Sequence, residues 1–206
     1  MSSYISKGAT ISACGRYRYR LWREWRGTGT DANWDWLTDK SGKRVVDGGG
    51  HPLGEPKSAL FIMLNPSTAD GERDDPTIRR CVAFAKAWGY DRMDVVNLFA
   101  WRATKPADLL AVNHPDDPVG VNNKDHIEAA ARKAGIIICA WGAHGSHLGQ
   151  DETTLGWLTD TQLRRCHTLK VTKDGHPGHP LYIAASTVPA PFAKATPYKL
   201  RPEMVP

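Results

Sequence analysis

The sequence predicts one three-layer α/β/α domain built on a central, mainly parallel sheet. Three short apolar runs, at 59–65, 93–99 and 135–141, have the length and composition of buried strands. Segments with helical patterns separate them, at 75–88 and 122–133. Because a β-α-β-α-β order places helices on the faces of a parallel sheet, these segments favour an α/β/α architecture.

Length and composition support a single domain spanning residues 1–206. The chain has 27 Lys and Arg against 22 Asp and Glu, a net charge of +5, which suits a polyanionic partner. No apolar run approaches the roughly 18 residues that a membrane-spanning helix needs, and the first residues do not resemble a signal peptide. We therefore expect a cytoplasmic monomer that does not enter a membrane.

The N-terminal region, 14–58, predicts a β-rich insert with basic and aromatic side chains. At 17–26, aromatic or aliphatic residues alternate with arginines over part of the run, which is typical of a half-exposed strand with a basic face. Turn-rich stretches flank two further candidate strands at 34–37 and 43–46. The strand at 17–26 could either track a nucleic-acid backbone or protect a sheet edge with its charges.

The first helix has clear end signals. Pro76 suits a first helical position and Gly89 suits the residue after the last turn. A shorter helical piece is expected through Leu109 and Leu110.

The C-terminal third is less regular. A polar loop at 142–149 opens a predicted helix that reaches about residue 166, and 167–172 predicts a fourth strand. Five prolines between 184 and 206 predict an extended or mobile tail.

Polar residues end two of the predicted strands. Asn65 closes the run at 59–65, and Asn97 lies near the end of the run at 93–99. In open α/β sheets, ligands bind outside the carboxyl ends of the strands. We therefore expect these asparagines to share one site.

Four motifs resemble the DUF1643 family, a bacterial and phage family, over roughly residues 14–183. They are Asn65-Pro-Ser-Thr-Ala-Asp70, Asn97-Leu-Phe-Ala-Trp-Arg102, Trp141-Gly142 and His179-Pro-Leu-Tyr182. Their order also resembles the uracil-DNA glycosylase superfamily, in which an Asn-Pro-type turn, a base-reading Asn and a His-Pro turn follow successive strands. The chain departs from that pattern at Met63, which replaces a Gly, and at Leu181, which replaces a Ser. This resemblance implies a uracil-DNA-glycosylase-like fold.

The resemblance implies catalytic roles for Asn65, Asp70 and His179. Cleavage of an N-glycosidic bond builds positive charge on the sugar and negative charge on the departing base. Asn65 could hold the attacking water, with Asp70, Asp74 or Asp75 sharing the task because an amide is a poor base. His179, or alternatively His176, could stabilise the departing base.

Further residues are implied as substrate contacts. The Asn97 amide can donate and accept hydrogen bonds at the edge of a flipped base. The ring of Phe99 or Trp101 could stack on the flipped base. Pro66, Ser67 and His176 complete the predicted base site, and phosphate contacts are expected from four basic residues, Arg16, Arg18, Arg102 and Lys173.

Neither a metal nor an organic cofactor is expected. The spacings His144-x-x-His147 and His176-x-x-His179 could bind a metal, but neither has a convincing third ligand in the sequence. The four cysteines form no Cys-x-x-Cys pair, so neither a disulfide framework nor an iron–sulfur cluster is indicated.

The expected function is therefore DNA glycosylase activity that leaves an abasic site. The target would be a flipped, modified base, for example glucosylated hydroxymethylcytosine in phage DNA, or uracil. Trp34, Trp36 and His51 offer a surface that could hold the sugar of such a base, although the tryptophans could equally form a small core under long loops. Excision from invading genomes would serve antiviral defence. Two alternatives stay open: a nucleic-acid-binding module without catalysis, and a hydrolase or transferase acting on free nucleotides.

Overall fold

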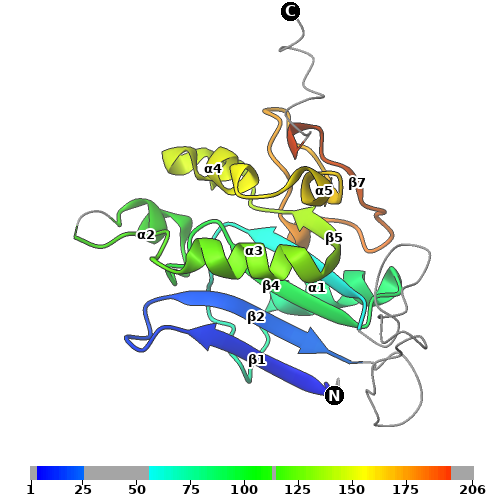
Figure 1. The fold of residues 1–206 in the computed structure, drawn as a ribbon, viewed down its shortest axis with the longest axis horizontal. Coiled ribbons are helices and arrows are strands. Elements are labelled where there is room, and N and C mark those ends of the chain that lie inside the picture. Colours follow the sequence, from blue (N-terminus) through cyan, green and yellow to red (C-terminus); the bar gives the residue numbers. More distant parts are fainter. Residues whose placement is uncertain (1–3, 26–55, 113–114, 196–206) are drawn as a thin grey trace, which may run out of the picture.

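A seven-stranded sheet forms the centre of the molecule, with the strand order β1-β2-β4-β3-β5-β6-β7. The computed structural model describes residues 4–25, 56–112 and 115–195 (Figure 1). The strands β4, β3, β5 and β6 are parallel, whereas β1, β2 and β7 are antiparallel to their neighbours. The strand bounds are β1 Ser6–Ile11, β2 Arg18–Glu24, β3 Ser58–Met63, β4 Arg92–Asn97, β5 Ala134–Cys139, β6 Cys166–Thr168 and β7 Ala190–Pro191.

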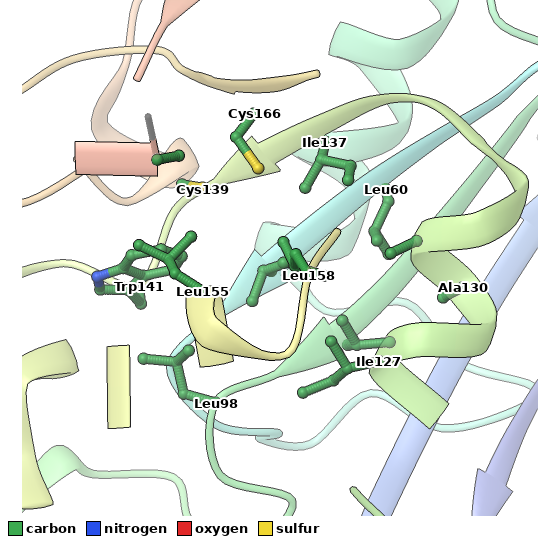
Figure 2. Packing of buried hydrophobic residues seen from close by; sticks show 14 of the residues in the cluster. Leu60, Leu98, Ile127, Ala130, Ile137, Cys139, Trp141, Leu155, Leu158 and Cys166 are labelled. Carbon is green, nitrogen blue, oxygen red and sulfur yellow. The ribbon is translucent and has the colours of Figure 1, made fainter. Parts of the chain in front are cut away.

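Helices cover both faces of this sheet, which confirms the predicted mixed α/β architecture with a mainly parallel central sheet. Leu60 and Ile62 of β3 pack with Ile127 on the α3 side, and Phe61 packs with Phe84 on the α1 side. Figure 2 shows the α3-side cluster. The helices are α1 Pro76–Ala87, α2 Pro106–Leu110, α3 Asn123–Lys133, α4 Gln150–Gly156 and α5 Asp160–Leu163, with 3₁₀ turns η1 Ala143–Gly149, η2 Pro180–Tyr182 and η3 Ala193–Ala195.

The predicted β-rich N-terminal region contributes strands that extend the central sheet. β2 pairs with β1 on one side and with β4 on the other, so it is not an edge strand, and the alternative that its charges protect a sheet edge was wrong. Its basic face was also wrong, because Arg18 and Arg23 are buried and Arg20 forms an ion pair with Asp94 at 2.6 Å. The candidate strands at 34–37 and 43–46 lie outside the described residues.

Helix α1 follows its sequence signals closely. The Asp75 side chain accepts a hydrogen bond from the Ile78 N–H, Pro76 occupies the first turn, and Gly89 adopts a φ of 78° just after the helix. Such a φ favours glycine because it carries no Cβ. The buried face includes Val82 and Phe84, so end signals and apolar spacing together predicted this element.

The C-terminal third differs from the prediction in three ways. Instead of one helix to residue 166, α4 ends at Gly156 and α5 begins after Thr159, where a capping box with Gln162 starts a new helix. Strand β6 has only three residues. The described part of the predicted tail, up to residue 195, joins the fold, because β7 pairs with β6 and Phe192 is buried.

Within the described residues, no helix is both long and apolar enough to cross a membrane. Cys81, Cys139 and Cys166 are buried free thiols, and Cys14 is an exposed one.

Candidate functional site

The carboxyl ends of the parallel strands bring three of the predicted motifs to one edge of the sheet. Met63 at the end of β3 pairs with Asn97 at the end of β4, and the Asn65-Pro66 turn follows directly. The chain after β6 leads to His179, which precedes η2, and η2 packs against α1. The N-terminus of α1, capped by Asp75, therefore lies beside the same edge.

Asn65 joins the turn after β3 to the loop after β4. Its Nδ2 donates to the carbonyl oxygens of Ala103 at 2.8 Å and Pro66 at 3.0 Å. Two acceptor partners fix the orientation of the amide, because only the nitrogen can donate. The Oδ1 atom is left as the hydrogen-bond acceptor that this side chain can offer to a ligand or a water.

Asn97 is a buried amide without side-chain partners. The residue is 1% exposed, and within the described ranges neither Nδ2 nor Oδ1 has a hydrogen-bond partner. Met93 and Val95, at alternate positions earlier in β4, pack on the α1 side, so Asn97 also points to that side. Because a buried polar group without a partner costs about 1–3 kcal/mol, such a group is typical of a ligand site or an ordered-water site.

The three candidate carboxylates have different surroundings. The Asp70 Oδ1 accepts hydrogen bonds from the N–H groups of Arg73 at 2.7 Å and Glu72 at 2.8 Å, and these bonds hold its pKa below the usual value. Asp74 is bound by Arg23 at 2.7 Å and also accepts from Tyr4.

Asp75 and Asp70 both carry charges that act on the pKa of Arg18. Asp75 also caps α1, and its charge acts on the pKa of His179 as well. Asp75 is therefore the one of these two carboxylates whose charge reaches both Arg18 and His179.

His179 is held as a neutral hydrogen-bond donor. Its Nδ1 accepts from the Leu181 N–H at 3.3 Å, which places the proton of the neutral ring on Nε2. Burial lowers the pKa of His179, and the charge of Asp75 opposes this effect. His176 lies in the same loop, and its Nδ1 is buried without a partner.

An open pocket of about 530 Å³ lies between the turn after β3 and the loop after β4, and Asn65, Asn97, Asp75 and His179 are not among its lining residues. It brings together four predicted residues, Arg16, Ser67, Trp101 and Arg102, and it adds Gly15, Thr68, Ala103, Thr104 and Asp108. The Arg16 guanidinium lies 5.5 Å from the Trp101 ring centroid and pairs with Asp116 at 2.6 Å. The sequence did not indicate Thr104 or Asp108, because the start of α2 carries no motif of its own.

Several predicted contacts lie elsewhere. Phe99 is fully buried in the α3-side core, with its ring centroid 5.6 Å from that of His147. It is therefore a core residue, and Trp101 is the aromatic side chain at the pocket. Pro66 is buried, and Lys173 is exposed in the loop after β6. Arg18 is 3% exposed, so it does not offer a surface contact to a DNA phosphate.

Among the residues that the structure describes, no group of three or more His, Cys, Asp or Glu side chains could hold a metal ion. The pairs His144/His147 and His176/His179 therefore gain no third ligand from this part of the chain.

Comparison with known proteins identifies a family. A family model described as a protein of unknown function, DUF1643, matches residues 51–181, a range that includes Asn65, Asn97 and His179. No curated protein and no solved structure matches the chain. Because the match covers more than half of the sequence, the chain belongs to the DUF1643 family.

Proposed function

We propose that this protein is a DNA glycosylase that hydrolyses the N-glycosidic bond of a flipped, modified base. The observation that carries the proposal is the unpaired, buried amide of Asn97 at the end of β4. It lies at the same sheet edge as the acceptor oxygen of Asn65 and the neutral donor of His179. An amide can read the edge of a base because it donates and accepts at once.

The reaction separates charge, and each site residue fits one part of it. As the bond breaks, the sugar becomes positive and the base negative. The Asn65 oxygen would orient the attacking water, and the carboxylate of Asp75 would stabilise the positive sugar. The Nε2–H of His179 would donate to the departing base. These groups are held in place before the reaction, which is the condition for electrostatic stabilisation of a transition state.

The open pocket suits the parts of the substrate outside the catalytic centre. Arg102 would supply positive charge for DNA phosphates, with Lys173 in the exposed loop after β6. Arg16 would contribute less charge, because it already pairs with Asp116. The Trp101 ring, with the hydroxyls of Ser67 and Thr68 beside it, offers an apolar face next to hydrogen-bonding groups. That combination suits the sugar of glucosylated hydroxymethylcytosine, and such a substrate would give the protein a role in antiviral defence. Uracil is the simpler alternative base.

Base release from defined DNAs tests the proposal. Purified protein is incubated with uracil-containing DNA, unmodified DNA and phage DNA carrying glucosylated hydroxymethylcytosine, and released bases are measured by mass spectrometry. We expect release from one modified DNA, loss of release in Asn97→Leu and Asn65→Ala, and full release in Asn122→Ala. Asn122 is a matched control, because it is exposed and makes no side-chain capping bond. Salt-sensitive DNA binding without any base release would indicate a binding module instead.

A hydrolase or transferase acting on free nucleotides is the second candidate. The pocket volume of about 530 Å³ falls in the range of small-molecule sites, roughly 300–1,000 Å³. Turnover of free nucleosides or nucleotides, with DNA binding that depends little on salt, would favour this function.

A further inference from the structure

Strand β2 carries two buried arginines whose surroundings differ. Arg23 is fully buried, and its Nε donates to the Asp74 carboxylate at 2.7 Å. Its other nitrogens donate to main-chain oxygens, including those of Trp22 at 2.8 Å and Asp70 at 2.7 Å. This guanidinium has the partners that a structural buried charge requires.

Arg18 has fewer polar partners than Arg23. It is 3% exposed, its Nη1 donates to the Ala69 carbonyl at 2.7 Å, and its Nε has no hydrogen-bond partner among the described residues. Within the described part of the chain, no carboxylate forms an ion pair with it. Burial lowers the pKa of Arg18 to about 10, so the side chain is still protonated at neutral pH. A buried cation without an anion is unfavourable unless a ligand supplies the negative charge.

A change of register in β2 turns Arg18 toward the candidate site. Thr10 pairs with Arg20 and Ile11 with Arg18, so Tyr19 is an extra residue between these pairs, as in a β-bulge. Tyr19 stacks on His126 of α3 at 4.9 Å, whereas Arg18 reaches Ala69 on the α1 side. Bulges commonly redirect a side chain next to an active site.

The surroundings of Arg18 are those of the proposed catalytic centre. Its main-chain N–H donates to the Ala100 carbonyl at 2.9 Å, three residues beyond Asn97. Its bond to Ala69 reaches the segment that runs from Asn65 to Asp75. The charges of two carboxylates, Asp75 and Asp70, and of two arginines, Arg102 and Arg23, act on its pKa. Arg18 and Asn97 are thus two buried groups with unpaired polar atoms on neighbouring strands, at the same edge and on the same face of the sheet.

We propose that Arg18 is a catalytic residue that stabilises the negative charge developing on the departing base; this role rests on the proposed glycosylase function. The anion that Arg18 meets could be a DNA phosphate or the departing base. The burial of Arg18 favours the base, because a flipped nucleotide inserts its base into the protein while its phosphates stay at the surface. The exposed side of the pocket, with Arg102, suits the phosphates. A buried guanidinium on the same edge and face of the sheet as Asn97 suits the base.

In the proposed step, the bond between the sugar C1′ and the base nitrogen breaks, and its electron pair stays on the base. Arg18 and the Nε2–H of His179 hydrogen-bond to the resulting anion. The water oxygen forms the new bond to C1′, and one water proton passes to the Asp75 carboxylate. The base then leaves after taking a proton from the solvent. A cation that forms no ion pair before this charge appears favours the transition state over the ground state.

The first test compares departing bases of different acidity. Single-turnover release is measured for the base that the wild type excises and for a more acidic, halogenated derivative, with Arg18→Met, Arg18→Lys and Arg20→Met. Arg20 is the matched control on the same strand, because it pairs with Asp94 on the opposite face.

We expect Arg18→Met to slow release by about 100-fold or more, with a smaller loss for the acidic base. Arg18→Lys should release the base faster than Arg18→Met but more slowly than wild type. Arg20→Met should release it at the wild-type rate. Equal losses for both bases, or no loss, would overturn the role of Arg18.

The second test needs no base release. Binding of 5-nitrouracil, an acidic base that is anionic at neutral pH, is measured by calorimetry with wild type and the same variants. We expect at least a tenfold weaker affinity in Arg18→Met, weaker wild-type binding at a pH where the base is neutral, and an unchanged melting temperature. If no DNA releases a base but this binding depends on Arg18, the glycosylase function fails and the anion site stands. If the variants release the base normally and the affinity for 5-nitrouracil is the same in wild type and Arg18→Met, the proposed role of Arg18 is wrong and the glycosylase function stands.

Discussion

At the scale of single residues, hydrogen-bond partners separate structural polar groups from candidate functional ones. Asn97 and Asn123 are both buried, but Asn123 Nδ2 donates to the main-chain oxygens of Asn97 at 2.9 Å and Leu98 at 3.0 Å, whereas the Asn97 amide has no partner. The sequence could place Asn97 at a strand end. It could not show which amide is paired, because the partners come from segments distant in the chain.

This contrast predicts opposite effects of two matched substitutions. Asn123→Leu removes two main-chain hydrogen bonds and should lower the free energy of unfolding by about 1–3 kcal/mol. Asn97→Leu removes an amide that has no partner, so the free energy of unfolding should change by less than about 1 kcal/mol or rise. Urea denaturation of both variants measures the difference. A loss in Asn97→Leu as large as in Asn123→Leu would show that Asn97 is structural.

The lowered pKa of His179 predicts a pH dependence with a defined sign. The unfolded chain protonates this histidine near pH 6.5, and burial places the folded pKa lower. Between these values the unfolded state binds more protons, so stability falls as the pH drops below 6.5. His179→Gln should show a smaller loss of stability than wild type between pH 7.5 and 5.5, measured by urea denaturation.

A second histidine makes the control for this measurement. The pKa of His126 is also lowered, chiefly by burial, so it contributes a slope of the same sign. His126→Gln should therefore reduce the pH dependence of stability without affecting base release. His179→Gln should reduce both. An unchanged slope in His179→Gln would contradict the assigned neutral state.

At the scale of elements, local signals predicted α1 well and β2 poorly. Pro76, Gly89 and the apolar spacing define α1 within its own segment. The burial of β2 depends on pairing with β1 and β4, on the bulge at Tyr19 and on the Arg23–Asp74 ion pair. These are tertiary features, and arginine is rarely buried unless it is paired. An alternating pattern of arginines therefore suggested a solvent-exposed face.

Two substitutions of Asp75, at the start of α1, should distinguish its structural role as an N-cap from a catalytic role of its charge. Asp75→Ala removes the N-cap and should cost about 0.5–2 kcal/mol of stability. Asp75→Asn keeps an N-cap of similar strength but removes the charge beside Arg18 and His179. It should therefore retain stability and lose most of the base-release rate, and the pKa of His179 should fall further because the opposing charge is gone. Denaturation, base-release assays and NMR titration of His179 measure these effects. Full activity in Asp75→Asn would exclude a role for its charge.

At the scale of the whole molecule, one edge of the sheet collects the candidate chemistry, and distant segments complete it. The sequence predicted that Asn65 and Asn97 would meet, because parallel strands place their carboxyl ends together. It did not predict that β2 from the N-terminus would supply a buried arginine there. Nor did it predict that the segment after Ser186 would close the far edge of the sheet, since short strands with prolines carry little local signal.

Salt dependence tests which end of the molecule meets DNA. Arg102 lines the pocket at the carboxyl edge, whereas Lys86 lies in the last turn of α1, toward the opposite edge. Arg102→Ala should weaken DNA binding and reduce the slope of log affinity against log salt by about 1. Lys86→Ala should leave the slope unchanged. Equal changes in both variants would indicate binding by overall charge and not by this edge.

In the segment after Ser186, substitution of Phe192 should cause a large loss of stability. Phe192 is 4% exposed, its N–H donates to the Cys166 carbonyl at 3.0 Å, and its ring meets Trp141 edge-on at 5.8 Å. Trp141 lies at the end of the α3-side core in Figure 2. Phe192→Ala should therefore cost about 3–5 kcal/mol. Val188→Ala, in the same segment but 77% exposed, should change stability by less than about 0.5 kcal/mol. Urea denaturation compares the two, and similar small effects would mean that this segment does not hold the sheet together.

Because Trp141 directly precedes the loop that carries η1, a loosened edge in Phe192→Ala should also slow base release at temperatures where the protein is still folded.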